Sequence, residues 1–222
     1  AARGKTVELG LIEGFYGKPW TWEARAEAVA FLAPHGYGFY LYAPKADAFL
    51  RERWREAHPP ETLEALARLA ERCRALGVRF GVGLSPFEIY RAFDDGAKAD
   101  LARKLDELQS VGVEDLAILF DDMRGDLPGL AKAQADIVHW IGARSSARLI
   151  FCPTYYSDDP VLDRAFGARP ANYLRDLGAA LDQAVDVFWT GEEVCSRAYG
   201  AEPLEQVGAA LLRAPVIWYN YP

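Results

Sequence analysis

Short apolar runs alternate with longer amphipathic stretches along the whole chain. Seven runs rich in β-branched, aromatic or aliphatic residues are typical of strands, at residues 7–14, 38–45, 79–86, 116–122, 148–154, 185–191 and 214–220. Stretches with helical spacing lie between them, most clearly at residues 60–77, 130–143 and 202–214. In the first of these, Pro60 suits a helix start and Gly77 a helix end. Its apolar stripe consists of Leu63, Leu66, Leu69, Cys73 and Leu76.

This alternation predicts a parallel sheet covered by helices on its outside. A doubly wound sheet and a (β/α)8 barrel both fit it. No strand is followed by a Gly-rich phosphate loop, and polar or aromatic residues follow nearly every strand, so we expect an α/β fold of the (β/α)8 TIM-type barrel class. About seven strands are readable, and we expect the eighth to be missing before the chain ends at Pro222. No linker or repeat divides the chain, so residues 1–222 are expected to form a single catalytic domain, cut short at its C-terminal end.

Charge and hydropathy exclude several classes of partner. The 25 basic and 32 acidic residues give a net charge of -7, which repels a nucleic-acid backbone and an anionic membrane surface. No apolar run reaches the roughly 18 residues of a membrane span. The start, "AARGKTVELG", shows no hydrophobic signal region, although a start without Met leaves open that one was removed. We therefore expect a cytoplasmic rather than a secreted protein, and the sequence gives no indication of its oligomeric state.

Metal and cofactor chemistry finds little support in the sequence. The three cysteines are far apart in apolar or helical surroundings and are expected to be reduced core thiols: Cys73, Cys152 and Cys195. The three histidines lie away from the predicted strand ends: His35, His58 and His139. Two adjacent aspartates could hold Mg²⁺ beside a substrate phosphate, but no phosphate cradle is present. We expect neither a metal nor a cofactor.

Hydrogen-bonding and aromatic residues gather after the predicted strands. In chain order they are Glu13, Gly14, Tyr16, Lys45, Asp47, Ser85, Asp121, Asp122, Thr154, Tyr155, Tyr156, Trp189, Thr190, Trp218 and Asn220. In a barrel the carboxyl ends of all strands meet at one mouth. Acids, one cation, amides, phenols and aromatic faces together suit a neutral, hydroxyl-rich ring such as a sugar. Simpler readings stay open, since Lys45 could be a solvated turn lysine and Trp218 part of the core.

The stretch "LAILFDDMRG", residues 116–125, runs from a strand directly into two aspartates. Adjacent residues on a regular strand point to opposite sides, so Asp121 and Asp122 must do different jobs. We expect one to lie inside the mouth under the sugar and the other to lean over the glycosidic oxygen. The ionised neighbour is expected to raise the pKa of the second, as a general acid needs. The alternative is that one aspartate caps the next helix and the other is solvated.

Six motifs then match one family in order. The chain resembles glycoside hydrolase family eighty-four, the β-N-acetylglucosaminidases that include O-GlcNAcases and bacterial hexosaminidases. The matching segments are "GLIEGFYGKPW" (10–20), "LYAPKAD" (41–47), "ILFDDM" (118–123), "FCPTYY" (151–156), "FWTGEEVCS" (188–196) and "APVIWYNYP" (214–222). The resemblance implies a (β/α)8 barrel and a retaining, substrate-assisted hydrolase of bacterial type. In that mechanism the sugar's acetamido oxygen attacks C1 and forms an oxazoline.

The same resemblance assigns roles to seven residues. Asp121 matches the residue that holds the acetamido N–H, and Asp122 matches the general acid that later activates water. Positions that contact the sugar or shape the acetamido pocket are matched by Gly14, Lys45, Tyr156, Trp218 and Asn220. The implied substrate is a carbohydrate or glycoprotein with terminal β-linked GlcNAc, and neither metal nor cofactor is implied.

The chain also departs from the family pattern. Ala46, Phe87 and Glu192 stand where the family has Asp, Gly and Pro. A further sugar-binding Asp of the family, and its last strand, would both lie past Pro222. A non-catalytic GlcNAc-binding domain is therefore the alternative function. A Schiff-base aldolase that uses Lys45 is a third reading, which requires a desolvated, neutral lysine.

Overall fold

A computed structural model describes residues 7–220, in which the strands pair in chain order and all in parallel. The strands are β1 (Leu9–Glu13), β2 (Tyr37–Tyr42), β3 (Arg79–Leu84), β4 (Asp115–Leu119), β5 (Arg148–Cys152), β6 (Asp186–Trp189) and β7 (Val216–Ile217). All seven predicted strands are confirmed. The predictions on residues 1–6, and on the last two residues of the "WYNYP" motif, lie outside the described residues.

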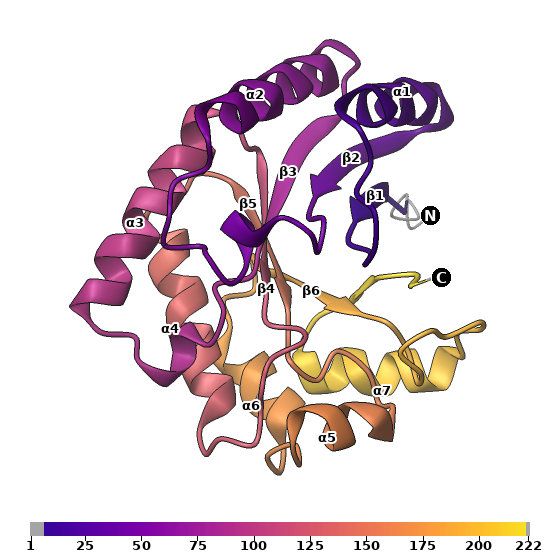
Figure 1. Cartoon of the computed structure of the whole chain (residues 1–222). Helices are drawn as coiled ribbons and strands as arrows, with labels where there is room; N and C mark the ends of the chain where they lie inside the picture. Colours follow the sequence, from indigo (N-terminus) through magenta and orange to yellow (C-terminus); the bar gives the residue numbers. More distant parts are fainter. Residues whose placement is uncertain (1–6, 221–222) are drawn as a thin grey trace.

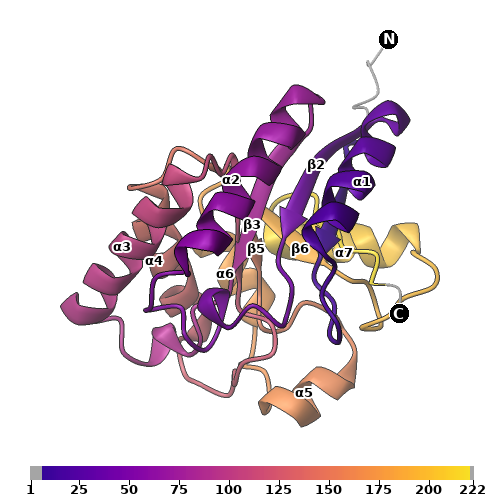
Figure 2. The same cartoon turned by 45° about the horizontal axis from the view of Figure 1, so that its top comes forward.

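Helices surround the outer face of the curled sheet (Figure 1). They are α1 (Trp22–Leu32), α2 (Pro60–Ala75), α3 (Asp95–Ser110), α4 (Leu130–Gly142), α5 (Pro160–Phe166), α6 (Tyr173–Ala180) and α7 (Ala201–Leu211), with 3-10 turns η1 (Ala33–His35), η2 (Ala48–Leu50) and η3 (Ile89–Arg91). The predicted helices correspond to α2, α4 and α7. The short α5 lies among the loops that follow the strands (Figure 2). Within the described residues, no helix is long and apolar enough to cross a lipid bilayer.

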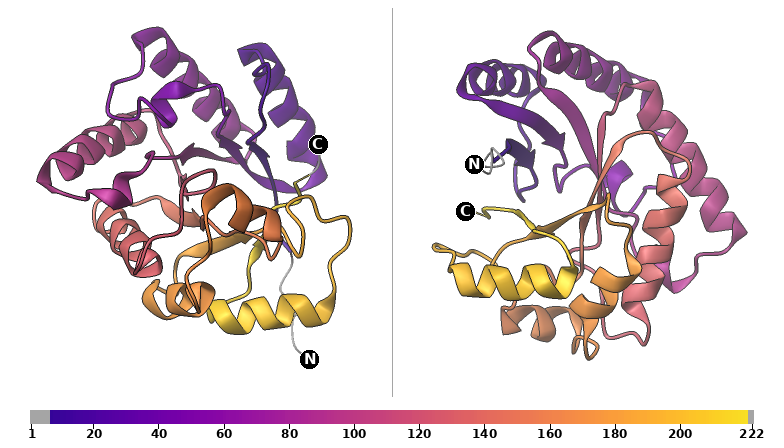
Figure 3. Two further views of the ribbon diagram at one scale, coloured as in Figure 1. Left: turned by 60° about the horizontal axis from the view of Figure 1, so that its bottom comes forward. Right: turned by 180° about the vertical axis from the view of Figure 1, so that it is seen from behind.

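The fold is a partial (β/α)8 barrel, as predicted, and not a doubly wound sheet. Strand neighbours follow chain order from β1 to β7 without the reversal of a doubly wound sheet. Views from two further sides show the helices on one face of the sheet, with the strands curling inside them (Figure 3). The carboxyl ends of all strands consequently meet on one side of the molecule.

Two apolar clusters lie on the two faces of the sheet. On β2, Phe39 and Leu41 belong to the cluster inside the curl, whereas Tyr40 and Tyr42 belong to the larger cluster beneath the helices. The inner cluster also contains Ala117, Leu119, Ile150, Cys152 and Phe188. Side chains therefore alternate inward and outward with a period of two, which fixes what the next residue after each strand can reach.

A layer of charged pairs covers the amino ends of the central strands. Glu8 accepts hydrogen bonds from Arg79 at 2.7 Å and from Arg148 at 2.9 Å. Arg79 also binds the fully buried Asp115, and Arg148 binds Asp186. These pairs neutralise charge where two arginines lie together.

The cysteine prediction holds for two residues and is wrong for the third. Cys73 and Cys152 are buried free thiols. Cys195 is exposed, because it lies in the loop between β6 and α7 and not on a packed face.

Candidate functional site

A cavity of about 560 Å³ opens at the carboxyl ends of the strands, and we call it the mouth pocket. It is lined by Gly14, Phe15, Tyr16, Lys45, Asp121, Asp122, Cys152, Tyr156, Thr190, Trp218 and Asn220. All seven residues given roles by the resemblance line this one cavity. Their placement together is an observation, and their roles in a reaction stay predictions.

The two aspartates reach the pocket by different local routes. Strand β4 ends at Leu119, and Asp121 continues the inward series of Ala117 and Leu119. Asp122 would point outward on a regular strand, but its backbone takes a left-handed conformation with φ 58°. Aspartate tolerates this conformation better than most residues. The turn therefore brings both carboxylates to the same side, and the opposite-facing arrangement expected of a regular strand does not occur.

Lys45 joins the two carboxylates. Its Nζ donates to Oδ2 of Asp121 and, at 2.8 Å, to Oδ2 of Asp122. The hydroxyl of Tyr16 donates to the same Asp122 oxygen at 2.6 Å. The Lys45 side chain is only 6% exposed, so the reading as a solvated turn lysine is wrong.

Asp121 keeps one acceptor unused. Its Oδ1 is buried and has no hydrogen-bond partner among residues 7–220. A buried carboxylate oxygen without a partner is costly, and a ligand N–H could satisfy it. This geometry suits the predicted contact with an acetamido group.

The charges of Lys45, Asp121 and Asp122 shift the pKa values of Lys45 and Asp122. Burial raises the pKa of Asp122, but the ion pair with Lys45 and the Tyr16 hydrogen bond outweigh burial and hold that pKa below its usual range. The predicted raised pKa of Asp122 is therefore wrong for this arrangement, because a cation lies between the two carboxylates. Burial lowers the pKa of Lys45, and the two carboxylates raise it by more, so the amine stays charged. A charged, ion-paired lysine argues against the aldolase reading.

Aromatic rings form the walls of the mouth pocket. The Trp218 backbone N–H donates to Trp189 at 2.9 Å, and its ring meets Phe188 edge-on at a centroid distance of 5.1 Å. A Cβ on Gly14 would lie 2.7 Å from Trp218 Cζ2, so this close approach requires glycine. Burial is also the main cause that raises the pKa of Tyr156, so its hydroxyl stays protonated and can donate.

Several predicted members of the mouth lie elsewhere. Glu13 points to the helix side of the sheet, where Arg25 binds both of its oxygens at 2.8 Å. Asp47 accepts from Tyr42 and contacts His58, and it does not line the pocket. The position of Glu13 follows from the strand phase, which the list of strand ends did not use, whereas Asp47 lies beyond the end of β2 and caps η2.

Phe15 and Cys152 line the pocket and were not predicted as site residues. Cys152 follows Ile150 in the inward series of β5, so the alternation of side chains could have found it. Phe15 lies in the loop after β1, where no periodic pattern applies.

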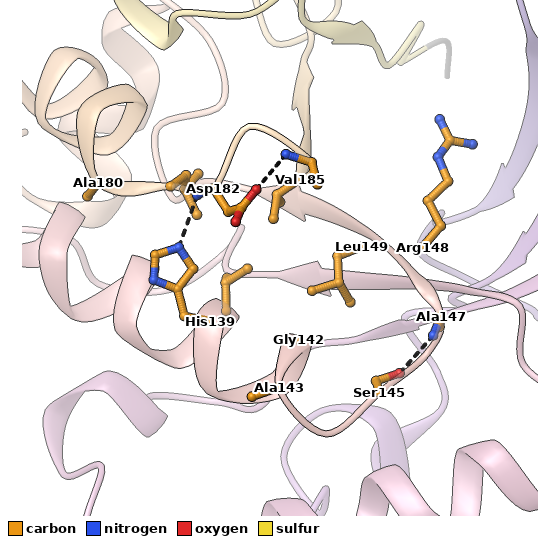
Figure 4. A pocket seen from close by; sticks show the side chains of 13 residues that line it. His139, Gly142, Ala143, Ser145, Ala147, Arg148, Leu149, Ala180, Asp182 and Val185 are labelled. Carbon is orange, nitrogen blue, oxygen red and sulfur yellow. Dashed lines mark hydrogen bonds between the residues drawn. The ribbon is translucent and has the colours of Figure 1, made fainter.

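A second cavity, which we call the base cavity, has a volume of about 540 Å³. It lies at the amino ends of β5 and β6, between the ends of α4 and α6 (Figure 4). Its polar groups bond to nearby backbone: His139 Nε2 accepts from the Asp182 N–H at 3.0 Å, Asp182 from Ala184, and Ser145 from Ala147. The base cavity holds no pair of acids, so we assign the functional site to the mouth pocket. Within residues 7–220, no group of three or more His, Cys, Asp or Glu side chains is placed to bind a metal ion.

Comparisons with known proteins point to one family. A family profile described as beta-N-acetylglucosaminidase matches residues 9–222. Proteins named Protein O-GlcNAcase from Rattus norvegicus and Mus musculus are each 33% identical over 223 residues, which covers 95% of this chain and 24% of the relative. The structure of a mutant O-GlcNAc hydrolase from Thermobaculum terrenum is similar with a TM-score of 0.86 at 34% identity, covering 97% of this chain and 48% of that one. The chain thus spans about a quarter of the length of these curated relatives.

Proposed function

Because the chain belongs to the β-N-acetylglucosaminidase family, we propose that it forms the catalytic barrel of an enzyme that hydrolyses terminal β-linked N-acetylglucosamine. The relatives named Protein O-GlcNAcase support a glycoprotein as the substrate, with another glycan as the alternative. The reaction is a glycoside hydrolysis that retains the configuration at C1.

One observation carries this proposal: the Asp121 and Asp122 carboxylates share a single lysine at the mouth of the barrel. A two-carboxylate retaining mechanism needs one carboxyl group on each side of the scissile bond. Here both carboxylates bind the same Nζ, and the ion pairs hold them together rather than apart. This arrangement supports a nucleophile that comes from the substrate itself, as the family resemblance implies.

The acetamido group of the sugar supplies that nucleophile in our proposal. Its carbonyl oxygen attacks C1, the glycosidic bond breaks, and an oxazoline forms. Asp121 accepts the acetamido N–H through its unpartnered Oδ1 and stabilises the positive charge that develops on the group. Trp218 and Tyr156 enclose the ring, in keeping with the apolar walls and polar tips that sugars need.

Asp122 handles the proton at the leaving group. It donates a proton to the departing glycosidic oxygen and then removes one from the water that opens the oxazoline. Its lowered pKa in the Lys45 pair means that a sugar must first weaken this pair, or that the reaction favours acidic pH. Lys45 lines the pocket and lies where sugar hydroxyls can replace a carboxylate as its partner.

Hydrolysis of two matched aryl glycosides tests the proposal. The full-length protein should cleave an aryl N-acetyl-β-glucosaminide and leave the corresponding aryl β-glucoside almost untouched, because only the first carries the nucleophile. A thiazoline mimic of the oxazoline should inhibit it competitively. Comparable cleavage of both glycosides would refute the substrate-assisted mechanism. Binding of N-acetylglucosamine without cleavage would favour the non-catalytic binding domain.

A further inference from the structure

Arg51 is a buried cation beside the mouth pocket that none of the roles above uses. It follows η2, and its side chain is only 13% exposed. Two of its nitrogens, Nε and Nη1, are buried without a hydrogen-bond partner among residues 7–220. Its nearest acid is Glu52 at 3.6 Å, whose side chain is 58% exposed, so this ion pair contributes little. Burying a guanidinium in this way lowers stability, which makes a purely structural role a poor explanation.

The backbone around Arg51 fixes its position. Asp47 caps η2 by accepting the Phe49 N–H at 3.0 Å, and the Arg51 N–H donates to Ala48 at 3.0 Å. The preceding carbonyl, of Leu50, accepts from the Ser85 N–H at 2.8 Å, which ties the segment to the end of β3. The backbone from which the Arg51 side chain extends is therefore held by hydrogen bonds within η2 and to the end of β3.

The side chain of Arg51 lies against Tyr16. Its guanidinium carbon is 5.7 Å from the centroid of the Tyr16 ring, within the range of a cation–π contact. Tyr16 is 67% exposed, its ring centroid is also 5.6 Å from Lys45 Nζ, and its hydroxyl donates to Asp122 at 2.6 Å. Arg51 does not line the mouth pocket, unlike Lys45. Its charge consequently stays beside Tyr16 and Asp122 when a sugar enters and engages Lys45.

We propose that Arg51 is a positioning residue for the proposed hydrolysis, which holds Tyr16 against Asp122 and keeps a positive charge behind that hydrogen bond. Asp122 becomes an anion when it gives its proton to the leaving group, and the guanidinium stabilises that anion. The charge of Arg51 also lowers the pKa of Asp122, after the effects of burial, Lys45 and Tyr16. The inference rests on the proposed function, because it assigns Arg51 a part in the same reaction.

The test compares Arg51→Met and Arg51→Lys in the full-length protein. One substrate is an N-acetyl-β-glucosaminide with an activated aryl leaving group, and the other carries a poor alkyl leaving group. In Arg51→Met, kcat/KM should fall about tenfold more for the poor leaving group than for the activated one, because only the poor one needs proton donation. The basic limb of the kcat/KM profile should move to higher pH, since loss of a cation raises the pKa of Asp122. Arg51→Lys keeps the charge and should restore most of both effects.

A matched control is Arg68→Met on α2, which removes an arginine whose side chain is 69% exposed and should leave both readouts unchanged. Equal losses on both substrates with an unmoved basic limb would overturn the inference, since a structural role alone predicts that result. Tyr16→Phe adds a second measurement: Arg51→Met should cause a smaller loss in its background than in the wild type, because the part of the role that acts through Tyr16 is already absent. Effects that multiply would show that Arg51 does not act through Tyr16. Should Arg51→Met fail to fold, Arg51→Gln, which also removes the charge but keeps a polar side chain, replaces it in the same measurements.

The inference and the proposed function fail in different ways. If the wild-type protein cleaves neither substrate, the proposed function is wrong and the role of Arg51 falls with it. If the wild-type protein cleaves both and Arg51→Met leaves their ratio and the pH profile unchanged, the function stands and the role of Arg51 is wrong.

Discussion

The mouth pocket and the base cavity lie at opposite ends of the same strands, and their volumes are about 560 and 540 Å³. In the base cavity, His139, Asp182 and Ser145 each bond to a backbone N–H close by. In the mouth pocket, two carboxylates compete for one lysine, and Oδ1 of Asp121 has no partner among the described residues. Cavities of similar size therefore differ in whether their polar groups are satisfied, and the unpartnered carboxylate oxygen of the mouth pocket is available to a ligand.

The largest expected effect comes from Asp122→Asn, which removes the proposed proton donor at the mouth. For a poor leaving group, kcat/KM in the full-length protein should fall by about 10²- to 10⁴-fold, whereas an activated phenol departs with little help. A leaving-group series measures this difference as the slope of log kcat/KM against the pKa of the leaving group. A slope equal to that of the wild type would contradict the assignment.

Asp121→Asn should cost about 10²-fold or more on every substrate. The charge on the acetamido group develops whatever the aglycone is, so support for it matters equally across the series. The same series therefore separates the two aspartates. Two indistinguishable slopes, or a steeper slope in the Asp121 variant, would reverse or remove the division of roles.

Lys45→Met tests the charge balance of the mouth through stability. Two largely buried carboxylates lose their cation, so the free energy of unfolding should fall by about 2 kcal/mol near neutral pH, allowing for the partial exposure of Asp122. The pKa of Asp122 is lowered in the folded protein. The ion pair with Lys45 therefore stabilises the fold at pH values above the pKa of an unfolded aspartate, about 3.9, and this stabilisation is lost as the pH falls through the pKa of the folded state. Urea unfolding should thus show a difference in the free energy of unfolding between the wild type and Lys45→Met that becomes smaller below about pH 4.

The surface pair of Lys132 and Asp136 provides the control for that experiment. Lys132→Met removes an exposed lysine on α4 and should change stability little at any pH. If the free energy of unfolding of Lys45→Met differed from that of the wild type by the same amount at neutral and acid pH, the carboxylates would not be the cause of the difference.

Asp182→Asn in the base cavity should have the smallest effect. It weakens one turn contact to Ala184, so the melting temperature should fall by a few degrees at most. The kcat/KM should stay within about twofold of the wild-type value, because no group of the proposed reaction is touched. A tenfold loss of kcat/KM would show that the base cavity takes part in function, which would contradict the assignment of the functional site to the mouth pocket alone.

The sequence predicted the strands and their parallel order, because side-chain alternation is a local property, whereas the seven residues with assigned roles in the mouth pocket were matched through the family resemblance. Asp121 follows the inward phase of Ala117 and Leu119 and could be placed from that pattern alone. Asp122 could not, since its left-handed backbone, with φ 58°, departs from the strand pattern. The direction of its pKa shift also depends on Lys45, which lies 77 residues away along the chain. The alternation of side-chain direction holds only within the strand, and the side-chain positions of the residues after it depend on tertiary contacts.

The close approach of Gly14 to Trp218 makes these two positions a single unit for protein engineering. A Cβ at position 14 would lie 2.7 Å from the edge of the indole ring, so Gly14→Ala is damaging while the tryptophan is present. Replacing Trp218 first with a smaller side chain removes that clash, and the same alanine then becomes acceptable. The order of substitution thus decides the outcome, and a library that varies one position at a time will miss every enlarged pocket that needs both changes together.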